Sequence, residues 1–139
     1  MKLFVLEDGS QNLIQLVERT EDREKVISAL APIEVRSAIR RRERLGDISD
    51  AHADQALSAL LAESRRLVEQ PLSSDVLSRA AALLDRHALR SLDALQLATS
   101  LVLREQLLHN EELLFICSDN RLIEAAAAEN LKTYNPAVD

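Results

Sequence analysis

The chain has 139 residues, two Phe, one Tyr, no Trp, and a formal net charge of −6. This length predicts a single domain over residues 1–139, with a core of Leu, Ala, Val and Ile. The acidic balance argues against a general nucleic-acid coat protein, which would be basic, and no apolar run is long enough to span a bilayer.

Helical and strand-like segments alternate along the chain. Apolar residues spaced by three and four predict helices, and short apolar or β-branched runs predict strands. In the first half of the chain we expect a helix over 10–17, a strand over 25–28, a helix from Pro32 to Gly46, where it stops, a helix that begins at 49–50 and a strand over 66–69. In the second half we expect helices over 73–85 and 91–106, a strand over 113–117, a helix over 119–129 and a strand over 132–134. This order predicts an α/β fold, a three-layer parallel sheet flanked by helices.

Asp93 is the most informative residue. It lies in a segment with apolar residues on nearly every side of the expected helix, which indicates a buried helix. A carboxylate there is costly unless it is paired, hydrogen-bonded or bound to a cation. One interpretation is a first-turn acid favoured by the helix dipole, with Ser91 as the N-cap, and the other is a cation ligand.

Two further acids follow expected strands. Glu34 comes after the strand over 25–28, and Asp119 comes after the strand over 113–117, with Ser118 between. In an open α/β sheet, ligands bind beyond the carboxyl ends of the strands, so these acids and Asp93 can converge. Oxygen ligands suit Mg²⁺ or Mn²⁺. Glu34 as a first-turn acid and Asp119 as an N-cap are the structural alternatives.

Other residue patterns predict less. Arg36, Arg40 and Arg44 form a stripe on one helix face, either a solvated face or a rim that contacts phosphate near Glu34. The three histidines show no ligand spacing, and no phosphate-binding glycine loop is present. A single cysteine, Cys117, excludes an internal disulfide and, with no signal-peptide pattern, predicts a cytoplasmic protein.

Several segments together resemble a known family. Residues 90–99 (RSLDALQLAT) resemble the R-[AS]-x-D-A-[LI]-x-[LI]-A signature of PIN-domain ribonucleases, notably the VapC-like toxins of bacterial toxin–antitoxin pairs. Residues 31–38, 115–122 and 131–136 resemble the family's segments around its second acid, its last acid and its closing strand. Residues 2–10 are similar to the segment just after its first strand, so the resemblance covers essentially the whole chain.

The resemblance implies a metal-dependent endoribonuclease that hydrolyses RNA phosphodiesters. Glu34, Asp93 and Asp119 would be catalytic acids and ligands of Mg²⁺ or Mn²⁺, which lowers the pKa of a bound water. Ser118 would orient the site, and Arg36 and Arg40 are the candidates for substrate binding. A cognate antitoxin and a homodimer are the implied protein partners.

The sequence departs from the family at its N-terminal end. The family's first acid ends a central strand, in a pattern like D-[ST]-S-A-L, and this chain starts where that pattern would already be ending. Either the start is misassigned or the gene is truncated. We expect that strand and its acid to be missing and metal binding to be weakened as a result.

Two alternatives belong to other classes. A catalytically impaired PIN-like protein could still act as a binding or dimerisation module for an antitoxin or partner subunit. A phosphoacceptor receiver domain also uses acids at strand ends. It needs an acidic pair after the first strand and a lysine near the last, and no lysine fits in that place.

Overall fold

The computed structural model describes residues 26–65, 67–107, 111–136 and 138. The fold divides into two compact units, residues 1–69 and residues 70–139, and each is described by itself. The expected helix over residues 10–17 and the family-like segment over residues 2–10 lie outside the described residues.

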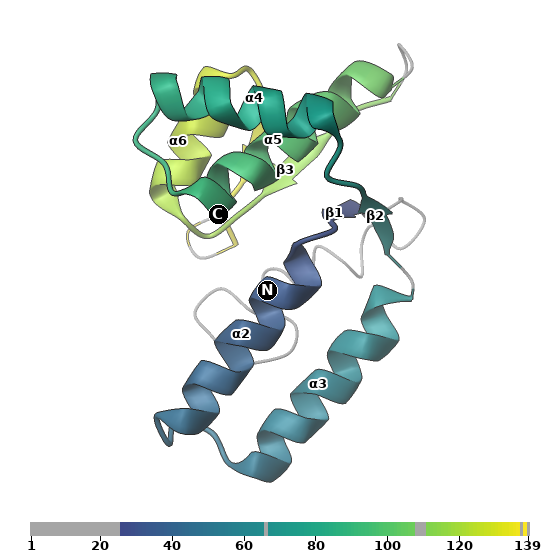
Figure 1. The fold of residues 1–139 in the computed structure, drawn as a ribbon, viewed down its shortest axis with the longest axis vertical. Coiled ribbons are helices and arrows are strands. Elements are labelled where there is room, and N and C mark those ends of the chain that lie inside the picture. The colour runs from purple at the N-terminus through teal and green to yellow at the C-terminus, as the bar shows by residue number, and fades with distance from the viewer. Residues whose placement is uncertain (1–25, 66, 108–110, 137, 139) are drawn as a thin grey trace. The chain divides into compact units, whose positions relative to one another are not determined.

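The first unit is built around two helices that pack side by side (Figure 1). Strand β1 (Val26–Ser28) leads into helix α2 (Ala31–Arg44), and helix α3 (Asp50–Ser64) leads into strand β2 (Val68–Gln70). β1 and β2 pair in a two-stranded sheet. A small apolar cluster joins the helices, made of Val35, Ile39, Ala53, Ala56, Leu57 and Leu60.

Both ends of α2 follow signals in the sequence. Pro32 lies in the first turn, where its missing N–H leaves no hydrogen bond unmade. At the other end Gly46 has a φ of 80°, which an L side chain disfavours. The N–H of Gly46 donates to the Glu43 carbonyl at 3.1 Å and that of Asp47 to the Arg42 carbonyl at 3.0 Å, so the last turn is closed.

The second unit holds the larger core. It comprises helices α4 (Ser74–Arg86) and α5 (Ser91–Gln106), strand β3 (Leu114–Ile116), helix α6 (Asn120–Ala128) and strand β4 (Lys132–Tyr134). α4 and α5 pack against each other, and β3 and β4 pair in parallel with Phe115 opposite Thr133. Fully buried core side chains include Val76, Leu83, Leu97, Leu101 and Leu122.

The expected α/β class is confirmed. The four strands of the described residues are short and form two sheets of two strands each, β1 with β2 and β3 with β4. The sequence placed these strands and the helices between them within two or three residues of their observed ends. It placed β2 too early, since the strand begins at Val68 rather than at residue 66.

A polar cluster centred on Glu129 joins three helices of the second unit. Arg86 Nη2 lies 2.7 Å from Glu129 Oε1, and His87 Nε2 lies 3.1 Å from Glu129 Oε2. Arg104 Nη1, from α5, donates to the Glu129 carbonyl at 2.8 Å. Burial raises the pKa of Glu129, but the hydrogen bonds from His87 and Arg86 outweigh it and the pKa is lowered.

We predict that Glu129→Gln lowers the free energy of unfolding at pH 7 by about 1 kcal/mol, because the charge-assisted hydrogen bonds are weakened. A lowered pKa stabilises the fold fully above the unfolded value of 4.5, and the contribution is lost as pH falls through the folded value. Urea unfolding of both proteins should therefore show a constant difference above pH 4.5 that shrinks below it. A difference that grows toward acid pH would contradict this account.

Candidate active site

Asp93 lies in the first turn of α5 and is half-buried. The helix around it is mostly buried, as expected, through Ala94, Leu97, Ala98, Leu101 and Val102. Leu92, an apolar residue of the same segment, is 46% exposed and not buried as the pattern predicted.

The expected N-cap of α5 is wrong. Ser91 is the first helical residue, and Arg90 occupies the cap position with no side-chain cap hydrogen bond. Because Ser91 is not the N-cap of α5, a capping arrangement with Ser91 does not explain why Asp93 lies in the first turn. A first-turn acid is still favoured by the helix dipole, so that structural role remains.

Asp119 lies at the N-cap of α6, directly after β3. Its Oδ1 accepts a hydrogen bond from the Leu122 N–H at 3.1 Å, which is the capping role expected as one alternative. The Asp119 N–H in turn lies 3.3 Å from Cys117 Sγ. This cap fixes the carboxyl group at the carboxyl end of β3 and engages Oδ1, so it is compatible with cation binding through the other oxygen.

The negative charge of Asp119 acts on Asp93. Burial raises the pKa of Asp93, the negative charge of Asp119 raises it further, and Arg90 opposes the shift. The thiol of Cys117 belongs to the same neighbourhood, because burial, Asp119 and Asp93 raise its pKa against a hydrogen bond from the Asp119 backbone.

Glu34 lies in the first turn of α2, after β1, and is partly buried. It belongs to the first unit, whereas Asp93 and Asp119 belong to the second. Among the described residues, no group of three or more His, Cys, Asp or Glu side chains is arranged to hold a metal ion. The structure therefore brings together two of the three predicted acids, and the place of Glu34 in the site stays a prediction.

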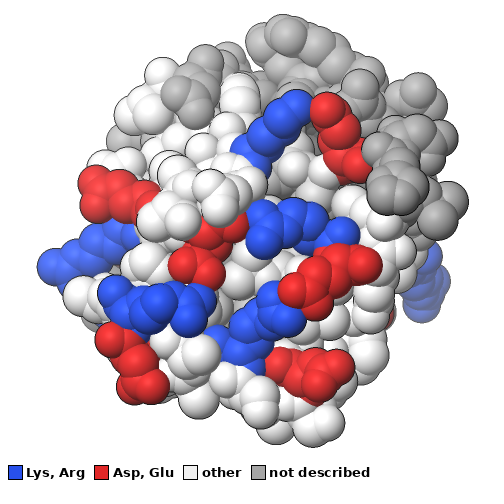
Figure 2. Space-filling view, turned by 90° about the horizontal axis from the view of Figure 1, so that it is seen from above, with Lys and Arg blue, Asp and Glu red and all other residues white. Residues whose placement is uncertain are grey.

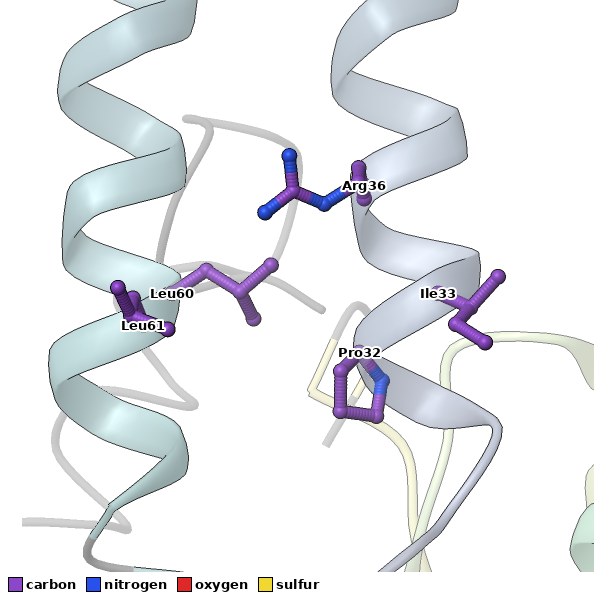
Figure 3. A pocket seen from close by; sticks show the side chains of 5 residues that line it. All are labelled: Pro32, Ile33, Arg36, Leu60 and Leu61. Carbon is purple, nitrogen blue, oxygen red and sulfur yellow. The ribbon is translucent and has the colours of Figure 1, made fainter.

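The two predicted arginines differ in their surroundings. Arg36 is exposed and extends from α2 toward α3 beside a pocket of about 110 Å³ lined by Pro32, Ile33, Leu60 and Leu61 (Figure 3). Arg40 is held by Glu43 at 3.1 Å and by Asp54 at 3.7 Å. Arg36 is thus the better placed of the two to contact a ligand, because the charge of Arg40 is already partly compensated.

Charged side chains are interspersed on the molecular surface. Figure 2 shows a face on which Lys and Arg side chains lie beside Asp and Glu side chains. Such a surface attracts a polyanion weakly. Binding to a nucleic acid would consequently depend on local contacts around the acid pair.

Sequence reasoning missed two asparagines near Asp119. Asn120 is the first residue of α6, and its Oδ1 accepts a hydrogen bond from Asn135 Nδ2 at 3.1 Å. Asn135 follows β4 and is only 4% exposed. For Asn135 the sequence offered one signal, since it is a polar residue between the expected last strand and Pro136. Ser118, half-buried, precedes Asp119 as expected, and its orienting role stays a prediction.

The donor set of this site fits a hard divalent cation. Two neighbouring carboxylates repel each other, and a cation between them would remove that repulsion. Mg²⁺ is typically held by one or two carboxylates, with water and substrate phosphate completing its shell.

We predict that Asp93→Asn raises the melting temperature at pH 7 in EDTA by a few degrees or less. The raised pKa means that ionised Asp93 destabilises the fold, a cost that appears as pH rises from 3.8 through the folded value. Differential scanning calorimetry should show equal stability of variant and wild type below pH 3.8 and a more stable variant at neutral pH. A variant that melts lower at pH 7 would refute the unfavourable environment assigned to Asp93.

Comparison with known proteins identifies the family of this chain. A search of curated proteins finds no significant match. None of the helices among the described residues is long and apolar enough to cross a membrane. The family model described as the PIN domain matches residues 2–128, and with most of its length covered the chain belongs to the PIN domain family.

Proposed function

We propose that this protein is a Mg²⁺- or Mn²⁺-dependent endoribonuclease and the toxin of a VapC-like toxin–antitoxin pair. PIN domains are in general nucleases that act on RNA and use divalent metal ions. The observation that carries the proposal is the position of Asp93 in the first turn of α5 and of Asp119 at the N-cap of α6, where the negative charge of Asp119 helps to raise the pKa of Asp93. Glu34 is proposed as the third ligand.

The chain's own residues would hold and orient the reacting groups. When bound, the metal supplies a water of lowered pKa and neutralises charge on the phosphoryl group. Asp119 is fixed by its cap on α6, and Asp93 is fixed by the buried helix behind it. Such rigidly held carboxylates limit the motion that would otherwise misplace the scissile phosphate. Arg36 is proposed to contact the RNA backbone.

Calorimetric titration with Mn²⁺ tests the metal site. Wild type should bind Mn²⁺, and Asp93→Asn and Asp119→Asn should each weaken binding at least tenfold. Asn is also a good N-cap, so Asp119→Asn should keep α6 intact. Asp85→Asn, an exposed acid on α4, is the matched control and should bind like wild type. Equal affinities across all four proteins would rule out the acid pair as the site.

Cleavage of a labelled single-stranded RNA in Mn²⁺ tests the reaction. We expect cleavage by the wild type and none by Asp93→Asn or Asp119→Asn. Cleavage that survives in both acid variants would refute the proposed catalytic residues.

The second candidate function is a binding or dimerisation module for an antitoxin or partner subunit. The pocket between α2 and α3 favours it, because Ile33 is 66% exposed and Leu61 56% exposed beside it (Figure 3). Apolar side chains in a groove between helices suit an amphipathic partner helix. If this is the sole function, Asp93→Asn keeps partner binding and Ile33→Glu loses it, as measured by co-purification with the protein encoded by the neighbouring gene.

A further inference from the structure

Asn120 and Asn135 form a polar pair at the same edge of the fold as Asp119. β3 and β4 run parallel, so their carboxyl ends point the same way. Asn120 follows β3 by way of Asp119, and Asn135 follows β4 directly. The hydrogen bond of 3.1 Å between their side chains therefore lies at the edge that carries the acid pair.

The hydrogen bond determines which groups Asn120 can offer a ligand. Asn135 is almost completely buried, so its side chain is a fixed donor. Asn120 Oδ1 accepts from it, which directs the amide nitrogen of Asn120, with its two N–H donors, away from Asn135. Asn120 is exposed, and no hydrogen-bond partner of that nitrogen is found among the described residues.

We propose that Asn120 is a substrate-positioning residue that donates a hydrogen bond from Nδ2 to a non-bridging phosphate oxygen of the RNA. This inference rests on the proposed ribonuclease function. Phosphate oxygens are strong acceptors, and the positive end of α6 favours an anion at this position. A phosphate occurs at every nucleotide, so this contact places the backbone beside Asp93 and Asp119 without reading the base.

Fluorescence anisotropy with a labelled single-stranded RNA tests the contact, with Ca²⁺ in place of Mg²⁺. Asn120→Ala should weaken RNA binding roughly fivefold, the net value of one typical hydrogen bond. Asn120→Asp should weaken it more than tenfold, because a carboxylate repels phosphate. Glu124→Gln, at an exposed position one turn farther along α6, is the matched control and should bind like wild type.

Thermal unfolding separates this role from a structural one. Asp keeps the oxygen that accepts from Asn135, and the helix dipole favours an acid in the first turn, which offsets the repulsion from Asp119. Asn120→Asp should therefore melt close to wild type while it loses RNA affinity. In cleavage assays both Asn120 variants should raise KM more than they lower kcat. Affinity that is unchanged in Asn120→Asp, or that falls only in step with the melting temperature, overturns the inference.

The outcomes distinguish this inference from the function on which it rests. If wild type binds and cleaves RNA and the Asn120 variants behave like it, only the role of Asn120 is refuted. If wild type shows neither RNA binding nor cleavage, the ribonuclease proposal fails and the role of Asn120 fails with it.

Discussion

The acid pair of Asp93 and Asp119 is the constraint on which the second unit depends. A partly buried carboxylate next to a second one is unfavourable, and the raised pKa of Asp93 reflects both causes. The fold nevertheless fixes both groups, one through a buried helix and the other through a cap. Surrounding structure must stabilise such an arrangement, and the apolar core of α4, α5, α6 and β3 does so.

Asp119 is a helix cap, and its carboxyl group is also a proposed metal ligand. As an N-cap it satisfies an amide at the start of α6, so it contributes to stability without any cation. The same hydrogen bond sets the direction of its carboxyl group relative to β3. A structural explanation and a functional explanation of this acid are therefore complementary, and finding the cap does not weaken the case for a ligand.

Local signals in the sequence predicted the elements well and the site in part. Pro32 and Gly46 act through their own backbone geometry, and Ser73 and Asp119 act through side-chain hydrogen bonds to the next turn, so the helix ends they mark were predictable. The cap of α5 was not, because Ser91 and Arg90 compete for one position and tertiary packing decides. The link between Asn120 and Asn135 joins residues on two elements, and no local pattern specifies it.

The polar groups at the carboxyl ends of β3 and β4 favour a binding site over the start of α6 alone as their explanation. A helix start needs acceptors for its free amides, and Asp119 alone supplies one. Asp93 adds a second negative charge that the fold does not need, and Asn120 adds donors beside it. Carboxylates for a cation and donors for the anion it carries are complementary requirements of phosphodiester chemistry. The raised pKa of Asp93 marks a cost of its ionised form to the fold, and the proposed cation site would remove that cost.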